Sequence, residues 1–546
     1  MFYRAIPQSA LIICLSFGPL MGDDSVSRFK GLVLVPSRQE MLGDEELEEC
    51  VGIFSRGVDV PGRWYDFAER MQPLYFDQPI DDSTLQQIKA GIHSYFEEQA
   101  YPFIVVTIPP QKITSAVLQV EVEVGNVGKI AVEGNQWTAD QTLLEYIGLS
   151  SGHPISEAKL LKGVQFMNRN PFRRVDAIYS PGERENQTDI TLAVQEERIY
   201  HLYTGADNTG VPTTGRNRYF VGLTWNQIFG LDHVLFYQYT TSQSFHTLQA
   251  HTLQYLAFLS NQTILTLYGG YSTVHVHLKE PSRKSGGENG QGSVRYTVPL
   301  NSVDPFVHEL TFGFDFKQTN NTVEFVDQNP IIARPVNLTQ WMGGYRLKTS
   351  TSYCFNDLNF ELYGSPVEWL PNQENSHFDS LRPGAKNQWV YFRGSWRHEH
   401  TLFHSWQGVL LSRFEWASIP LLPSEQLGIG GYESVRGYDE RQLDADTGGF
   451  LSAELRTPSF RVFTKKNSSK QDMALFLLFV DGGVSYDKVA VPTTKKFDYL
   501  IGAGPGIRYS FSSYLNGRLD MGFKLHNKAT FTGGSPMFHF SLIGNY

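Results

Sequence analysis

Apolar and polar residues alternate strictly in parts of the second half of the chain. Leu310, Phe312, Phe314 and Phe316 occupy every second position, while Thr311, Gly313, Asp315 and Lys317 lie between them. A period of two predicts a strand with one apolar and one charged face. Lipid outside and water inside a barrel wall demand such a strand. Residues 265–271, 398–403 and 538–546 show weaker versions of the pattern.

The residues after Arg198 therefore predict a transmembrane β-barrel over 199–546. At roughly 20 residues for a strand and its connection, the length fits about 16 antiparallel strands. The strands must pair all the way round, because an unpaired backbone group in hydrocarbon costs several kcal/mol.

Two α+β patterns precede the barrel. In the first, at 72–126, Leu85, Ile88, Ile92, Tyr95 and Phe96 follow helical spacing behind a capping Asp81 or Asp82, and strands are expected at 103–108 and 117–124. The second, at 127–198, combines a strand from Lys129, helices around Leu143 and from Ser156, and strands at 174–182 and 188–194. We expect two small domains.

The start of the chain has the pattern of a secretory leader. Arg4 precedes a short apolar core at 10–18, so residues 1–22 predict a signal peptide whose cleavage site stays open. Residues 23–71 contain a strand-like run at 29–35 and an acidic run at 44–49. We interpret them as an N-terminal extension or linker, and leave open whether they hold a plug helix.

Composition excludes several classes of protein. No stretch approaches the run of about 18 apolar residues that a membrane helix needs, and mean hydropathy is -0.28. With a net charge of -10, the chain has no basic patch for nucleic acid. Of three cysteines, Cys14 lies in the leader, which leaves Cys50 and Cys354 far apart. A disulfide between them is possible but nothing in the sequence supports it.

A long Gly-rich connection at about 420–448 joins strand-like segments at 409–416 and 449–455 and carries Val435, Arg436, Gly437 and Tyr438. These four residues resemble the Val-Arg-Gly-Tyr/Phe motif of the BamA-like outer-membrane barrel superfamily, whose sixth extracellular loop folds into the lumen. The resemblance implies that Arg436 points into a polar channel and pairs with a carboxylate. An arginine fork can bind one carboxylate bidentately and so lock a loop.

The expected partner is Asp481. It lies in a segment similar to the superfamily's Phe-x-Asp-x-Gly strand motif, of which Phe479 and Gly483 are the supporting residues. The chain ends on Tyr546, with Phe540 and Leu542 at even spacing before it. The resemblance implies that this is the closing strand and its assembly signal.

Order and motifs together resemble one family over 72–546. The domain at 72–126 is similar to a first polypeptide-transport-associated (POTRA) domain, and the next to a second, through segments at 108–111, 167–172, 180–182 and 188–192. The segment 226–232 resembles the first tight barrel turn. The whole is similar to the transporters of two-partner secretion systems (TpsB; haemolysin secretion/activation proteins of the ShlB/FhaC/HecB type).

That resemblance implies an outer-membrane transporter with periplasmic POTRA domains and no enzymatic activity. It would bind an unfolded exoprotein of the adhesin or haemolysin type, adding it to a sheet edge such as 117–124, and export it through the pore. Its other partners would be outer-membrane lipid and, during biogenesis, the barrel-assembly machinery. We expect a monomer without cofactor or nucleic acid.

Two further patterns in the sequence could be taken for binding sites. His398, His400 and His404 would share one face of a continuous strand, but a turn is expected near His404, so we predict no metal site. The glycines at 502–506 lack a surrounding βαβ unit and favour a strand that meets an inserted loop over a dinucleotide site. A BamA-like insertase and, remotely, a barrel hydrolase remain alternative functions.

Overall fold

The computed structural model describes residues 28–113, 115–184, 186–277, 284–301, 305–319, 335–365, 368–464, 470–489, 496–528, 531 and 534–546. The predicted signal peptide lies outside them. The chain forms two compact units: one holds residues up to Lys129 with 149–158 and 179–190, and the other holds 130–148, 159–178 and 191–546. None of the described helices has the length and apolar character needed to cross a membrane.

The first unit contains a four-stranded sheet in the order β2-β1-β4-β3. Its core lies between this sheet and two helices, and includes Leu32, Phe67, Ile88 and Phe96. The Asp81 side chain caps the second of these helices by accepting from the Thr84 backbone N–H at 2.7 Å. The elements of this part are β1 (Gly31–Val35), α1 (Asp44–Leu47), β2 (Gly52–Ser55), α2 (Trp64–Tyr75), α3 (Asp82–Glu98), β3 (Ile104–Thr107) and β4 (Val117–Val124).

Two expectations are corrected by this sheet. The described residues of 23–71 are not a separate extension, because β1 and β2 belong to the sheet and α2 packs in its core. The segment 117–124 is not a sheet edge either, since β4 pairs with β1 on one side and with β3 on the other. The edges of this sheet are β2 and β3.

A three-stranded sheet in the order β5-β7-β6 follows. Its strands are β5 (Asn126–Glu133), β6 (Arg173–Pro181) and β7 (Gln187–Glu196), and its helices are α4 (Asp140–Ile147) and α5 (Glu157–Met167). Gly148 ends α4 in the left-handed region, at φ 61°, as a helix C-terminus often requires.

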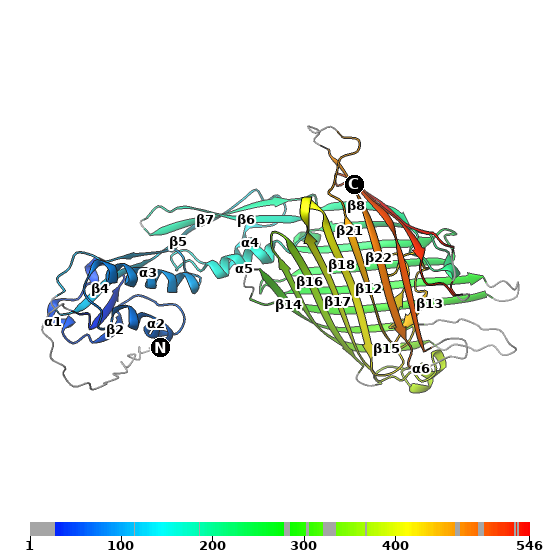
Figure 1. Ribbon diagram of the computed structural model, residues 1–546, viewed down its shortest axis with the longest axis horizontal. Coiled ribbons are helices and arrows are strands. Elements are labelled where there is room, and N and C mark those ends of the chain that lie inside the picture. Colours follow the sequence, from blue (N-terminus) through cyan, green and yellow to red (C-terminus); the bar gives the residue numbers. More distant parts are fainter. Residues whose placement is uncertain are drawn as a thin grey trace. The chain divides into compact units, whose positions relative to one another are not determined.

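Sixteen strands then form a closed antiparallel barrel in which β25 pairs with β8 (Figure 1). The strands are β8 (Tyr200–Asp207), β9 (Arg218–Asn226), β10 (His233–Ser242), β11 (Leu248–Phe258), β12 (Ile264–His277), β13 (Lys284–Pro299), β14 (Phe306–Thr319), β15 (Val336–Ser350), β16 (Cys354–Gly364), β17 (Val390–Thr401), β18 (Gln407–Ala417), β21 (Thr447–Arg456), β22 (Asp472–Tyr486), β23 (Phe497–Phe511), β24 (Leu515–Lys524) and β25 (Met537–Asn545). The fold class predicted from alternation is confirmed.

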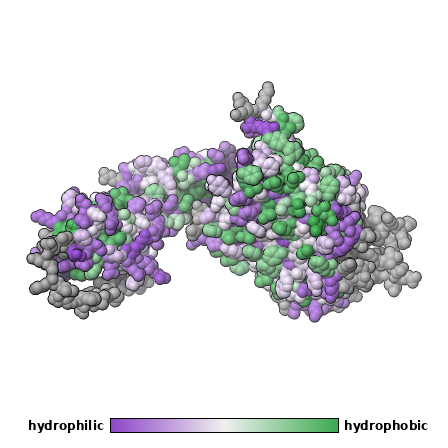
Figure 2. Space-filling model, in the orientation of Figure 1, coloured by the Kyte–Doolittle hydropathy of each residue, from purple (hydrophilic) through white to green (hydrophobic). Residues whose placement is uncertain are grey.

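Alternation is clearest along β22. Phe476, Leu478 and Val480 are more than half exposed, whereas Leu477, Phe479 and Asp481 between them are buried. The exposed set faces outward, and Figure 2 shows apolar side chains gathered over the barrel strands. One strand thus presents an apolar surface for lipid and a second face, carrying Asp481, to the lumen.

Candidate functional site: the loop inside the barrel

The connection from Ser418 to Asp446 runs across the inside of the barrel. It contains a short hairpin, β19 (Leu427–Ile429) and β20 (Leu443–Ala445). Its side chains bind residues of β14, β17, β21, β22 and β24, and its backbone at Gly437 binds a residue of β25. A loop that touches strands on so many sides of a closed barrel must lie in the lumen. Ile429, Val435 and Tyr438 are fully buried there.

Arg436 is the central charge of this loop and is 2 % exposed. Its Nε and one terminal nitrogen bind the two oxygens of Asp481 at 2.8 Å each, and its backbone N–H donates to Asp481 at 3.0 Å. The structure therefore brings together the two residues that the motifs pair. Burial opposes the charge of the guanidinium, but the surrounding carboxylates, Asp481 first, raise the pKa of Arg436 above its usual value.

Two further acids reach Arg436. Its other terminal nitrogen lies 2.6 Å from Glu454 on β21 and 3.5 Å from Asp520 on β24. Ser452 accepts a hydrogen bond at 3.0 Å. The Phe479 ring lies flat against the guanidinium, 3.6 Å from its carbon, which supplies a cation–π contact. Motif reasoning identified Asp481 and Phe479 but missed Glu454, Ser452 and Asp520.

Three more arginines surround these acids. Arg508 and Arg518 both bind Asp520, at 2.6 and 2.7 Å, and Arg456 binds Glu454 at 2.5 Å. The carboxylates are therefore shared between the loop and the barrel wall. Every charge in the cluster has an opposite partner, which is the condition for burying so many ions.

Glycines in the wall let the loop approach. A Cβ on Gly522 would lie 2.3 Å from the Gly437 nitrogen, and a Cβ on Gly502 would lie 2.0 Å from the Arg436 carbonyl oxygen. Gly437 itself has φ 98°, in the left-handed region. A Cβ on Gly483 would meet Ile429 at 2.5 Å. Gly502, the first glycine of the 502–506 run, therefore makes room for the inserted loop, as the sequence predicts.

Tyr438 fixes the far side of the motif. Its hydroxyl donates to the carbonyl oxygen of Ile501 at 2.8 Å, and its ring packs edge-on against Phe531. The Gly437 backbone N–H donates to Nε2 of His539 on β25 at 2.9 Å. Val435, Arg436, Gly437 and Tyr438 therefore all contact the wall.

A second attachment of the loop to the barrel wall lies earlier in the loop, at Glu425. Glu425 accepts from Lys317 at 2.8 and 2.9 Å, from the Tyr391 hydroxyl at 2.9 Å and from Gln340 at 3.2 Å. Burial opposes ionisation, yet Lys317 and these hydrogen bonds keep the pKa of Glu425 below its usual value. Lys317 belongs to the polar face predicted for β14, but its partner was not predicted.

Two arginines that lie between barrel strands also bind the loop. Arg382, directly after α6 (Asn375–Leu381), forms a bidentate pair with the fully buried Asp446 at the end of the loop. Arg216, between β8 and β9, binds Asp439 at 2.6 and 3.1 Å. The loop is thus held at four separated points, Glu425, Arg436, Asp439 and Asp446.

Comparison with known proteins decides the family. Residues 186–509 match the haemolysin secretion/activation protein family ShlB/FhaC/HecB, which covers more than half of the chain. The chain belongs to this family. The heme/hemopexin transporter protein HuxB of Haemophilus influenzae is 21% identical over 398 residues, 70% of this chain and 67% of HuxB. The outer membrane transporter CdiB of Dickeya dadantii is 22% identical over 423 residues, 76% and 72% of the two chains.

The solved structure of CdiB from Escherichia coli shares the fold. Its TM-score is 0.78 at 17% identity, with 96% of this chain and 91% of CdiB covered. Members of the ShlB/FhaC/HecB family are transporters of the outer membrane, so the barrel lies there and the α+β domains, which resemble POTRA domains, lie in the periplasm.

In this family member, the segments 167–172 and 226–232 meet. Asp232, between β9 and β10, accepts from Arg173 and Asn170 at 2.9 Å each and from the Tyr146 hydroxyl at 3.1 Å. Burial beside Asp232 raises the pKa of Tyr146 well above its usual value. These contacts mark the β9–β10 turn as the periplasmic end of the barrel.

The other site predictions concern the chain end and three histidines. Leu542 and Tyr546 are about half and mostly exposed on the outer side of β25, and Phe540 shares their side.

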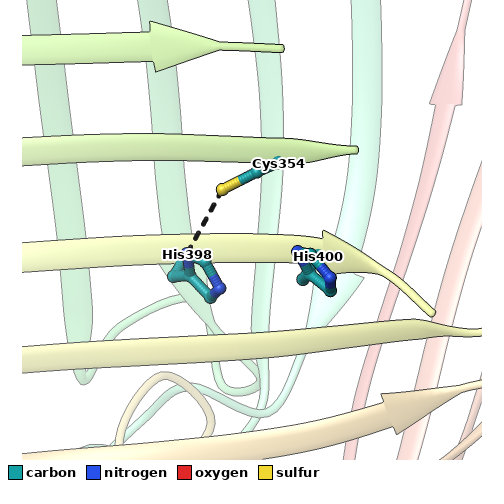
Figure 3. A group of neighbouring side chains, drawn as sticks. All are labelled: Cys354, His398 and His400. Carbon is teal, nitrogen blue, oxygen red and sulfur yellow. Dashed lines mark hydrogen bonds between the residues drawn. The ribbon is translucent and has the colours of Figure 1, made fainter. Parts of the chain in front are cut away.

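His404 lies in the turn η4 (Phe403–Ser405) with φ 52°. It does not join His398 and His400, whose neighbour is Cys354 of the adjacent strand (Figure 3).

Proposed function

We propose that this protein exports one large exoprotein, of the adhesin or haemolysin type, as an unfolded chain through the barrel. The observation that carries the proposal is the polar, ion-paired loop that lies in the lumen and is fixed there by Arg436. A polar lumen is required for a chain whose backbone seeks hydrogen bonds. Relatives carry names for cargo of this kind, such as the hemolysin transporter protein HpmB of Proteus mirabilis.

The pair of Arg436 with Asp481 sets the position of the loop, and transport requires that position. Because the loop is held by several separate contacts, cargo can displace one part of it while the Arg436 cluster keeps its tip on β22. Folding of the cargo outside the cell prevents its return, and no enzymatic step is involved.

Cargo capture uses an open sheet edge in the periplasm. β3 pairs with β4 alone in the described part of the chain, and Val105 on it is 53% exposed. An extended cargo segment that adds to this edge gains backbone hydrogen bonds of a β-ladder. This edge replaces the interior strand β4 as the capture site.

The remaining roles concern the ends of the protein and its state. Phe540, Leu542 and Tyr546 form the signal by which the barrel-assembly machinery receives the chain. The inserted protein acts as a monomer in contact with outer-membrane lipid, which a barrel that closes within one chain allows.

The test compares secreted proteins from the parent strain, a deletion strain, and the deletion restored with wild type, Arg436→Ala or Arg441→Ala. Arg441 lies in the same loop, but its pair with Asp444 is about 40% exposed. Its other hydrogen bonds, to the carbonyl oxygens of Pro423 and Gln426, stay within the loop, so its loss should leave the contacts with the barrel wall intact. We expect one large exoprotein to disappear on deletion and to return with wild type and Arg441→Ala only. The Arg436→Ala barrel should still migrate as a folded species in unheated gels.

Other outcomes would point elsewhere. Full secretion by Arg436→Ala would contradict the role of the pair. An unchanged set of secreted proteins together with depletion of many outer-membrane proteins would favour a BamA-like insertase. Phospholipid hydrolysis by the purified protein, lost on replacing a single serine, would favour a barrel hydrolase.

A further inference from the structure

A second polar cluster lies on the outer face of the barrel, away from the loop. Cys354 begins β16, and His398 and His400 lie near the end of β17. The Cys354 sulfur and one ring nitrogen of each histidine lie within 4.8 Å of one another. Figure 3 shows the three side chains on the two neighbouring strands. The contact between the Cys354 sulfur and Nδ1 of His398 is 3.8 Å.

The strand register places this cluster. Cys354 pairs directly with His400, and Asn356 pairs with His398. Leu362 and Val390, at even spacing from them along the same strands, are exposed lipid-facing residues, so the cluster points outward. The turns next to it, at 350–354 and 401–407, join strands at the same end of the barrel as the β9–β10 turn. The cluster therefore lies at the periplasmic rim, where water and ions reach it.

The geometry points to a binding site for one d-block cation of the softness of zinc. One thiolate and two imidazoles are the donors that such an ion prefers. With bonds of about 2.3 Å to sulfur and about 2.0 Å to nitrogen, tetrahedral donors lie roughly 3.3–3.6 Å apart. Reaching this spacing requires the side chains to rotate, with His398 turned to present Nε2 in place of Nδ1, the nitrogen that now contacts the thiol. Binding forms one metal–sulfur and two metal–nitrogen bonds and releases the thiol proton to water, leaving a fourth position for a water molecule.

Asn356 already orients two of the ligands. Its side-chain N–H donates to Cys354 Sγ at 3.3 Å, which favours the thiolate. Its carbonyl oxygen accepts from Trp396 Nε1 at 3.2 Å and lies 2.8 Å from Nδ1 of His398. Since this oxygen only accepts, Nδ1 carries the proton and Nε2 of His398 is left with a free lone pair. Such outer hydrogen bonds are characteristic of metal-binding histidines.

The third ligand is accessible from solution. His400 is exposed, and its neighbour across β18 is Gly408, which adds no side chain. The exposed aromatics Tyr353 and Phe403 flank the site at the membrane interface. An ion bound here would tie β16 to β17 next to their periplasmic turns. This inference does not depend on the proposed export function.

Cobalt binding to the purified full-length protein in detergent, isolated without a histidine tag, tests the site. We expect one Co²⁺ per chain with a thiolate-to-cobalt charge-transfer band. Cys354→Ser should abolish the band, and His398→Asn and His400→Asn should each weaken binding by roughly tenfold or more. The matched controls Cys50→Ser and His404→Asn should bind as wild type.

A measurement without substitution covers the case in which a variant fails to fold. Zn²⁺ should protect Cys354 of the wild-type protein from alkylation and leave Cys50 reactive, as peptide mass spectrometry can show. A charge-transfer band that persists in Cys354→Ser, or equal alkylation of Cys354 with and without Zn²⁺, would overturn the proposal.

Discussion

Arg436 can be buried as an ion because its donors meet acceptors fixed in the wall. Burying a lone charge costs far more than the fold can supply, so the carboxylates of Asp481, Glu454 and Asp520 and the loop must be present together. Removing any one charge leaves the others unbalanced in a site with little water. The loop position is therefore decided by single residues rather than by the total contact area.

Gly522→Ala tests how closely the loop lies on the wall. The new Cβ would lie 2.3 Å from the Gly437 nitrogen, a backbone atom that cannot rotate away. We expect the loop to be displaced at a cost of about 1–3 kcal/mol, typical of overpacking, with lower secretion and faster proteolysis of the loop in folded barrels. Gly482→Ala is the matched control, since nothing lies within 4 Å of its Cβ. Equal behaviour of the two variants would contradict a tightly seated loop.

Glu440 makes the loop sensitive to pH. Burial raises the pKa of its carboxyl from 4.5 to about 7. Between these values the folded protein binds more protons than the unfolded chain, so stability falls as pH rises from 4.5 to 7 and then levels off. Glu440→Gln should remove this loss, which is at most about 3 kcal/mol. Apparent unfolding midpoints should rise at pH 8 and stay near wild type at pH 4.5.

The control for this pH dependence is Glu45→Gln, at an exposed position of α1. It should leave the difference between the two pH values unchanged. A Glu440→Gln variant with the full wild-type pH dependence would exclude this carboxyl as its source.

At the scale of elements, β14 has two functions on its two faces. Phe312 faces outward and is 56% exposed, while Lys317 reaches Glu425 of the loop. The alternation predicts the two faces, since a period of two is a property of one strand. It cannot predict Glu425 as the partner, because more than a hundred residues and several strands lie between them. The same limit explains why Glu454 and Asp520 were missed around Arg436.

The Lys317–Glu425 pair should behave as a buried pair in a double-mutant cycle. Lys317→Met alone leaves Glu425 buried without its cation, and we expect a loss of about 3–5 kcal/mol in unfolding free energy. The double variant Lys317→Met, Glu425→Gln should lose clearly less, because no uncompensated charge remains. Arg346→Met breaks the pair with Asp357 on the wall, in which the arginine side chain is 41% and the aspartate side chain 17% exposed, and should cost less than Lys317→Met. Additive losses in the cycle would show that the two residues are not coupled.

The N-terminal sheet shows where local patterns fail. β4 has a clear alternation, and the prediction of a strand at 117–124 is confirmed. The strands that pair with β4 could not be predicted in the same way. Its parallel pairing with β1 joins residues about 85 positions apart, and no local sequence period indicates such a pairing. The four-residue strand β2 is too short to show a period at all. The sequence pattern therefore predicts a sheet edge at a strand that lies in the interior of the sheet.

For the whole molecule, the barrel could be predicted because lipid imposes one rule on every strand. This rule and the order of the motifs together predict that the barrel closes, that it has about 16 strands and that Asp481 lies on the lumen side of the wall. The N-terminal part has no comparable outside constraint, so its strand order could not be derived. The proposed function joins a periplasmic capture surface to the pore that contains the loop.

The β3 edge is the proposed capture surface. If cargo adds to the β3 edge, its side chains contact the exposed face of this strand, where Val105 is 53% exposed. Val105→Lys should weaken binding of a cargo segment by roughly tenfold, about 1.4 kcal/mol, because a charge on an edge strand discourages strand addition. Affinity for an extended segment of the exported protein would be measured with the full-length protein in lipid nanodiscs, alongside secretion. Tyr65→Lys, an exposed change on α2 of the same domain, should leave both unchanged. Unaltered affinity in Val105→Lys would move the capture site away from β3, to β2 or to the β5-β7-β6 sheet, without affecting the role of the Arg436 loop.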